Sequence, residues 1–209
     1  MSPRSSEQNE KIREERIQQI IDAAIAVYLE KGVRGTEMGD IAKRANMARG
    51  LVYYYFKDKM DLFRFVFTRL IEEAKTYISS TLVSDEEVIS KLRTYARFYL
   101  RSSLLKPHMV QFYRNIPADI PFVFGDKGEA VLKEYVDNAT GPLHRVLEQG
   151  IREGKLKPLD PRLISAVYWG GLMGGMNAMS SGQVPEEQAE RVMDDVIDIL
   201  LDGIVNKKG

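Results

Sequence analysis

Apolar side chains recur at helical spacing in the N-terminal part of the chain. They lie three and four residues apart, the period of one helix face, at Ile17, Ile20, Ile21, Ala24, Ile25, Tyr28 and Leu29. Gly32 follows this run and is a typical helix stop. Of the eight prolines, one is Pro3 and the other seven lie at or after Pro107. Because proline breaks helix interiors, its absence from residues 4–106 favours long helices there.

Two short segments and then a longer one follow. Thr36 is a good N-cap for a short helix over residues 37–45, and Asn46 separates this helix from a second one over residues 48–56. Asp58 is expected to cap a long helix. Further helices are predicted at about residues 85–101, 107–115, 127–153, 161–180 and 186–205. No run alternates β-branched and polar residues between hairpin turns, so the predicted fold class is all-α.

The two short segments have the residues that a helix-turn-helix needs. Its two helices cross steeply around a short turn, so the first helix needs a small residue at the crossing. Ala42 supplies this residue, and Ile41 and Val52 are expected to meet in the core beside it. Asn46 occupies the turn, and asparagine tolerates the positive φ that such a turn requires. The spacing therefore predicts a helix-turn-helix over about residues 36–55.

The residues after the turn carry a more specific pattern. Residues 50–62 read GLVYYYFKDKMDL, which resembles the recognition-helix signature of the TetR (TetR/AcrR) family of transcriptional regulators. The resemblance covers about residues 12–65, and farther along the chain it is limited to length and helical character. It implies an N-terminal three-helix DNA-binding domain at residues 10–70. It also implies a C-terminal helical domain at residues 71–209 that binds an effector and forms dimers.

Several residues of this segment have side chains suited to DNA. The Thr36 hydroxyl and the amides after it are candidates for a phosphate contact. Arg49 is the best candidate for reading guanine, because a guanidinium matches O6 and N7 in a bidentate manner. Gly50 permits close approach of the backbone, and Leu51 is a candidate for contact with a thymine methyl group. Lys59 resembles the phosphate-contacting lysine of the family.

Three consecutive tyrosines cannot share one role, because successive helical residues point about 100° apart. By the family resemblance, Tyr53 and Tyr54 face DNA, and Tyr55 lies alongside it or anchors the helix. The alternative is that the run is ordinary core and surface. Asn46, Met47 and Tyr55 depart from the commoner residues of the family, which leaves the base preference open.

The C-terminal region is rich in aromatic residues and interrupted by prolines. An aromatic-lined cavity between broken helices would suit an apolar or aromatic effector, and an ordinary core is the alternative. The candidate ligand-binding residues are Tyr95, Phe98, Met109, Phe112, Tyr113 and Phe122. Arg97, Arg101 and Arg114 are placed to pair with a ligand carboxylate or to face solvent.

Two segments near the C-terminus are candidates for a two-fold, four-helix dimer interface. The candidate residues are Gly170, Gly171, Gly174, Gly175, Val192, Val196 and Ile199. Residues 163–185 carry no charge, but their glycines, serines and asparagine favour a closely packed helix over a membrane span. Asp194, Asp198 and Asp202 recur every four residues and are expected to face water.

Composition limits the chemistry. The 30 basic and 30 acidic residues balance, but residues 1–70 carry a net charge of +3 and residues 71–209 carry −3. This asymmetry favours an anion-binding module in the N-terminal part of the chain. There is no cysteine, and the two histidines, His108 and His144, are far apart in sequence, so no metal and no cofactor are expected. The N-terminus lacks an apolar signal segment, and a cytoplasmic location is expected.

These observations favour a homodimeric repressor that binds double-stranded DNA at a pseudo-palindromic operator and is released by a small-molecule effector. A constitutive DNA-binding protein without an effector is a second hypothesis. An enzyme with an accessory helix-turn-helix is a third, and the sequence offers it little chemistry. We expect no catalytic residues and no membrane partner.

Overall fold

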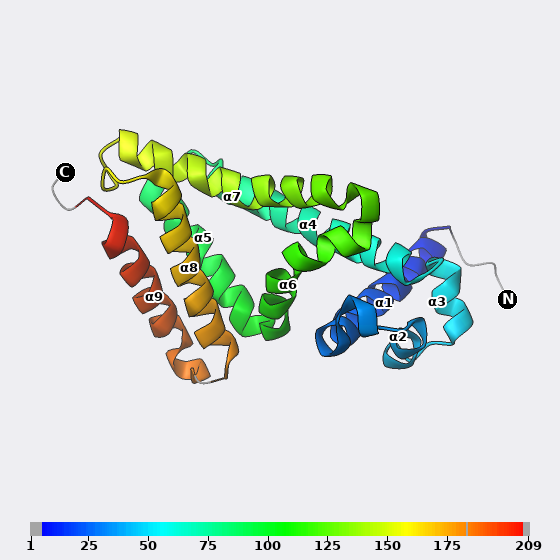
Figure 1. Ribbon diagram of the computed structural model, residues 1–209. Helices are drawn as coiled ribbons and strands as arrows, with labels where there is room; N and C mark the ends of the chain where they lie inside the picture. The colour runs from blue at the N-terminus through cyan, green and yellow to red at the C-terminus, as the bar shows by residue number, and fades with distance from the viewer. Residues whose placement is uncertain (1–5, 183, 207–209) are drawn as a thin grey trace. The chain divides into compact units, whose positions relative to one another are not determined.

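The structure is a computed structural model that describes residues 6–182 and 184–206. Apart from one isolated bridge between Leu156 and Val205, its regular elements in these ranges are helices, so the all-α prediction is confirmed (Figure 1). They are α1 (Ser6–Gly35), α2 (Met38–Arg44), α3 (Arg49–Tyr55), α4 (Lys59–Leu82), α5 (Val88–Leu105), α6 (Pro107–Phe124), α7 (Gly128–Arg152), α8 (Pro161–Ser180) and α9 (Ala189–Ile204), with 3₁₀ turns at Gly125–Lys127 and Glu186–Gln188.

Of two predicted boundaries near the start, the one at Gly32 is confirmed and the one at Thr36 is wrong. Gly32 interrupts the helix as predicted, with φ 67° and ψ 174°, and the short segment up to Gly35 that completes α1 follows this break. Thr36 does not cap α2, because the N-cap is Glu37, with extended backbone and no side-chain capping bond. Asp58 does act as expected, since the Asp61 amide donates to its Oδ1 at 2.8 Å.

The end of α6 was also placed too early. The prediction ended this helix at residue 115, but α6 continues through Pro117 and Pro121 to Phe124. Ile116, Ile120 and Val123 lie at helical spacing and are all buried. Their burial outweighs the hydrogen bonds that the two prolines cannot make.

The chain divides into two compact units. The first contains the residues up to Leu70 together with Ile116–Glu129, and the second contains Ile71–Asn115 and Ala130–Gly209. Within the first unit, the Tyr28 hydroxyl donates to Asp119 Oδ2 at 2.5 Å, and the Arg34 guanidinium lies 4.2 Å from the centre of the Phe122 ring. These contacts tie the end of α6 to α1. The first unit thus includes a segment well beyond residue 70.

The second unit is built on α5, α8 and α9, which pack against one another (Figure 1). Gly171 and Gly175 allow the close approach. A Cβ at Gly171 would lie 2.5 Å from Leu200 Cδ2, and one at Gly175 would lie 2.7 Å from Val196 Cγ1. The buried Tyr168 hydroxyl donates to the Leu92 carbonyl at 2.6 Å and links α8 to α5.

Ion pairs reinforce this packing on the outside. Asp198 lies 2.8 Å from Arg93, and Asp194 pairs with Arg97. The acidic residues of α9 that were expected to face water thus include two that pair with arginines of α5. None of the helices in the described ranges is long and apolar enough to cross a membrane.

Candidate nucleic-acid interface

The turn between α2 and α3 has the geometry that the sequence predicts. Asn46 adopts a φ of 52°, in the left-handed region. The Met47 amide donates to the Ala42 carbonyl at 2.9 Å, which closes the turn. Ile41, Ala42 and Val52 are buried around it. This core fixes the orientation of α3 against α2.

With Val52 buried, α3 presents a polar and aromatic surface to solvent. We call Arg49, Gly50, Tyr53 and Tyr54 the α3 surface, because all four are exposed. Tyr54 is the most exposed of the large hydrophobic residues in the described part of the chain, at 79%. A Cβ at Gly50 would meet no atom within 4 Å, so a second molecule can approach its backbone closely.

Arg49 is held by Tyr53, one helical turn away. Its Nη2 donates to the Tyr53 hydroxyl at 3.3 Å, and its guanidinium lies 5.5 Å from the centre of the same ring. The hydrogen bond to Tyr53 raises the pKa of Arg49 above its usual value. Arg49 makes no ion pair with any carboxylate in the described residues, so its charge is available to a ligand.

Tyr55 and Leu51 occupy the sides of α3. Both are half-buried, and the Tyr55 ring meets the Tyr54 ring edge-on with centroids 5.1 Å apart. Tyr55 therefore supports the position of Tyr54. Neither residue lies as far into solvent as Tyr54.

The two residues predicted to contact phosphates, Thr36 and Lys59, both donate hydrogen bonds to backbone carbonyls of α1. Thr36 is fully buried, and its Oγ1 donates to the Gly32 carbonyl at 2.7 Å, so the hydroxyl closes the end of α1 and is not presented to solvent. Lys59 is half-buried, and its Nζ donates to the Arg34 carbonyl at 2.9 Å. This bond holds the start of α4 against the end of α1 and leaves two ammonium protons for another acceptor.

The segment that joins α3 to α4 is tightly fixed. Phe56 is buried, and the Lys57 amide donates to Asp61 Oδ2 at 3.0 Å while the Asp61 amide donates to Asp58. The two bonds satisfy two backbone amides at the start of α4 and set the direction in which α4 leaves. The Lys57 side chain is exposed beside the α3 surface and was not among the predicted contacts.

Other basic residues of the first unit are neutralised by their neighbours. Arg44 lies 2.6 Å from Glu30, and Lys31 lies 2.7 Å from Asp40. The hydrogen bond from Lys31 holds the pKa of Asp40 below its usual value. The cations without such a partner thus include Arg49 and Lys57, at the two ends of α3.

The described residues among the six predicted effector residues have different surroundings. Tyr95 is buried and Phe98 stacks on Tyr77 with centroids 3.3 Å apart. Phe112 is buried and meets Tyr113 edge-on, while Phe122 belongs to the first unit. The Met109 side chain lies outside the described residues.

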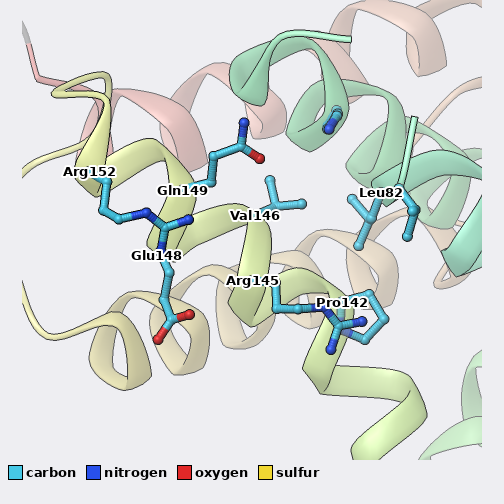
Figure 2. Close-up of a pocket in the computed structure, with 9 residues that line it drawn as sticks. Leu82, Pro142, Arg145, Val146, Glu148, Gln149 and Arg152 are labelled. Carbon is cyan, nitrogen blue, oxygen red and sulfur yellow. The ribbon is translucent and has the colours of Figure 1, made fainter. Parts of the chain in front are cut away.

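An aromatic cluster and a separate pocket occupy the second unit instead. The cluster consists of Tyr77, Tyr95, Phe98, Tyr99 and Trp169, and sequence reasoning missed Trp169, the only tryptophan of the chain. The pocket has a volume of about 400 Å³ (Figure 2). It is lined by none of the predicted residues, but by Leu82, Val83, Lys91, Pro142, Arg145, Val146, Glu148, Gln149 and Arg152.

The three arginines considered for a ligand carboxylate are engaged within the chain. Arg97 pairs with Asp194 and Glu190, and Arg101 lies 3.4 Å from Glu190. Arg114 donates to Asn177 Oδ1 at 3.2 Å.

The predicted dimer residues divide between the two faces of α8 and α9. Gly171 and Gly175 pack against side chains of the same chain, whereas a Cβ at Gly170 or Gly174 would meet nothing. On α9, Val192 and Val196 are half-buried, and Ile199 is 73% exposed. Leu163 and Val167 are also exposed and lie on the same face of α8 as Gly170 and Gly174, at helical spacing.

Comparison with known proteins agrees with this geometry. Residues 20–66 match the family model described as bacterial regulatory proteins, tetR family. Over 90% of the chain, the sequence is 28% identical to the fatty acid metabolism regulator protein of Bacillus subtilis (strain 168), covering 95% of that protein.

Solved structures extend the likeness to the whole fold. A TetR family transcription regulator from Marinobacter aquaeolei VT8 matches with a TM-score of 0.71 at 16% identity, over 95% of this chain and 100% of that one. The transcriptional regulator FadR from Bacillus subtilis, solved in complex with stearoyl-CoA, matches with a TM-score of 0.65 at 21% identity, over 89% and 98%. Together with the helix-turn-helix geometry, these matches place the chain in the tetR family of bacterial regulatory proteins, as a transcriptional regulator that binds DNA through its helix-turn-helix.

Proposed function

We propose that the protein is a homodimeric repressor that binds a pseudo-palindromic operator and is released by a small-molecule effector. The observation that carries this proposal is the α3 surface. Arg49, Tyr53 and Tyr54 are exposed on a short helix whose orientation is fixed by a buried core. A helix of this kind enters the major groove, and a dimer places two such helices in half-sites about one helical turn apart.

The contacts to DNA divide into two kinds. Arg49, held by the Tyr53 hydroxyl, is suited to reading a guanine, with Gly50 allowing close approach and Leu51 beside it. Tyr54, Lys57 and the free protons of Lys59 are suited to phosphates, which fix position and carry no sequence information. Because Thr36 is buried, we assign it a structural role at the end of α1.

The exposed apolar face of α8 and α9 supports dimer formation. Leu163, Val167 and Ile199 are large apolar side chains in solvent, and Gly170 and Gly174 allow another helix to come close. A two-fold axis through this face would bury all of them against their own copies. Gly171, Gly175 and the buried sides of Val192 and Val196 then hold α8 to α9 within each subunit.

The effector is best assigned to an apolar molecule of the acyl thioester class. The fatty acid metabolism regulator of Bacillus subtilis is similar over 90% of this chain, and a structural relative holds stearoyl-CoA. An effector that binds better to a dimer with wrongly spaced α3 helices would shift the population off DNA.

The first experiment is a gel-shift titration of the protein against the DNA upstream of its own gene. We expect one retarded complex at low salt, and its loss on addition of stearoyl-CoA. No binding at low salt would refute the proposal. Binding that stearoyl-CoA leaves unchanged, with no ligand-dependent thermal stabilisation, would favour the constitutive alternative.

Two substitutions separate the kinds of DNA contact. Lys59→Ala should weaken binding by a similar factor on operator and unrelated DNA, whereas Arg49→Ala should relax preference at one base pair, worth about 1–3 kcal/mol. Lys133→Ala on α7 is the control, since Lys133 pairs with Asp137 within its own helix. Equal sequence selectivity in the Lys59 and Arg49 variants would contradict this division of roles.

A further inference from the structure

The pocket in the second unit is basic. Its lining includes Lys91, Arg145 and Arg152 against one carboxylate, Glu148. Glu148 lies 3.4 Å from His144, and Gln149 donates to Glu153. Within the described residues, the side chains of these three cations form neither a hydrogen bond nor an ion pair. The pocket therefore holds an excess of positive charge that the chain does not neutralise.

Lys91 is the unusual member of this group. It lies in the first turn of α5 and is only 6% exposed, although lysine is rarely buried without a partner. No fully buried side-chain nitrogen or oxygen in the described residues lacks a hydrogen-bond partner, so the Nζ of Lys91, which has none, keeps some exposure to solvent, and Lys91 lines the pocket. An anion in the pocket would supply the counter-charge that this ammonium lacks within the described residues.

The arginines come from one face of α7. This face is formed by Pro142, Arg145, Val146, Gln149 and Arg152, which recur at helical spacing (Figure 2). Arg145 and Arg152 are two turns apart, or about 10 Å along the helix axis. Leu82, Val83 and Val146 supply apolar surface between the charges. This combination of three cations with apolar surface suits a ligand that carries more than one anionic group and an organic part.

We propose that this pocket binds a small organic phosphate with two or more anionic groups. Arg145 and Arg152 would each hold a phosphate through charge-assisted hydrogen bonds, and Lys91 would neutralise the anion from the α5 side. That the phosphate belongs to the effector rests on the function proposed above. The binding itself does not require that function.

The test is isothermal titration of the full-length protein, without DNA, with inorganic pyrophosphate, coenzyme A and dodecanoic acid. We expect binding of pyrophosphate and tighter binding of coenzyme A. Arg145→Gln, Arg152→Gln and Lys91→Met should each weaken both by about tenfold or more. Arg191→Gln on α9 is the matched control, because this arginine is exposed and outside the pocket.

The outcomes are distinct. If pyrophosphate and coenzyme A do not bind, or bind equally to the three pocket variants, the proposal is wrong. Binding of dodecanoic acid alone, lost in the pocket variants, would show a carboxylate site and would also overturn it. Should Lys91→Met fail to fold by circular dichroism, the exposed Arg145 and Arg152 still provide the test. A gel shift with the Arg145→Gln variant separates this result from failure of DNA binding.

Discussion

At the scale of single residues, the helix-turn-helix depends on a few side chains with unusual demands. Asn46 supports a positive φ, Val52 fills the space between two short helices, and Lys59 fastens α4 to the last carbonyls of α1. Each of these residues affects DNA recognition without a contact to DNA, because each fixes the orientation of the α3 surface.

Substitution of Asn46 should show this demand directly. Asn46→Ala removes the short polar side chain that lets asparagine adopt a φ of 52°, and we expect the free energy of unfolding to fall by about 1 kcal/mol. Asn46→Gly, which adopts this conformation without strain, should be close to neutral. Urea unfolding followed by circular dichroism measures both. An alanine variant as stable as the wild type would show that the turn is not strained.

Residues whose roles depend only on nearby backbone could be predicted from the sequence. Asn46 and Asp58 act through their own backbone within a few residues, so their roles were predictable. Thr36 was misassigned because its hydroxyl donates back to the Gly32 carbonyl and is buried there, and only the course of the chain after the break at Gly32 reveals this. The helix end at residue 115 was wrong for a similar reason: burial of the neighbouring apolar residues outweighs the tendency of Pro117 and Pro121 to break a helix.

The pocket could not be predicted in the same way. Lys91 lies on α5 and Arg145 on α7, so only the tertiary packing of the two helices brings them together. In the sequence, Lys91 looks like one more charged residue in an amphipathic helix. The aromatic residues gave a stronger signal, but most of them pack on one another and form core.

At the scale of elements, the contact of α8 with α5 and α9 is set by the absence of side chains. Gly175→Ala would place a Cβ 2.7 Å from Val196 Cγ1 and 2.9 Å from Leu100 Cδ2, between two helices that cannot both move. We expect destabilisation of about 1–2 kcal/mol, since overpacking exceeds the gain in helix propensity. Gly203→Ala on α9, where a Cβ meets nothing, should instead be neutral or stabilising. Thermal unfolding of both variants compares them, and equal midpoints would contradict this account.

Two half-buried tyrosines, one on α6 and one on α7, predict alkaline sensitivity. Burial raises the pKa of Tyr113 and of Tyr135 to about 12, from about 10 in an unfolded chain. A raised pKa in the folded state stabilises the fold below the unfolded pKa, and this contribution is lost as pH rises from about 10 to about 12. The urea midpoint, followed by Trp169 fluorescence, should therefore fall above about pH 10.

Removal of the two hydroxyls provides the control. The Tyr113→Phe, Tyr135→Phe double variant should lose less stability over this pH range than the wild type does. Tyr54→Phe, at an exposed position of the first unit, should follow the wild type. Identical pH profiles for the double variant and the wild type would exclude these tyrosines as the cause.

At the scale of the whole molecule, the proposed function depends on assembly into a dimer. The exposed face of α8 and α9 carries Leu163, Val167 and Ile199, and a dimer through it would pair two α3 surfaces on one operator. Dimer formation is important for a chain with zero net charge, because its overall charge does not attract DNA. Specific contacts from two α3 surfaces must then supply the affinity.

Sedimentation velocity tests this assembly. The wild type should sediment as a dimer, and Val167→Glu should shift it to a monomer with much weaker operator binding, because two carboxylates would meet near the two-fold axis. Val136→Glu, at an exposed position of α7, is the control and should remain dimeric. A monomeric wild type, or a dimeric Val167→Glu variant, would place the interface elsewhere.

The hydrogen bond between Tyr28 and Asp119 joins residues 91 positions apart. During synthesis the chain emerges from its N-terminus, so the first 70 residues leave the ribosome well before Asp119 is made. The first unit therefore lacks part of its own structure until the end of α6 has been translated. A fragment that stops at residue 70 lacks that last contribution, and the first unit becomes complete only after residues 71–115 of the second unit have been made.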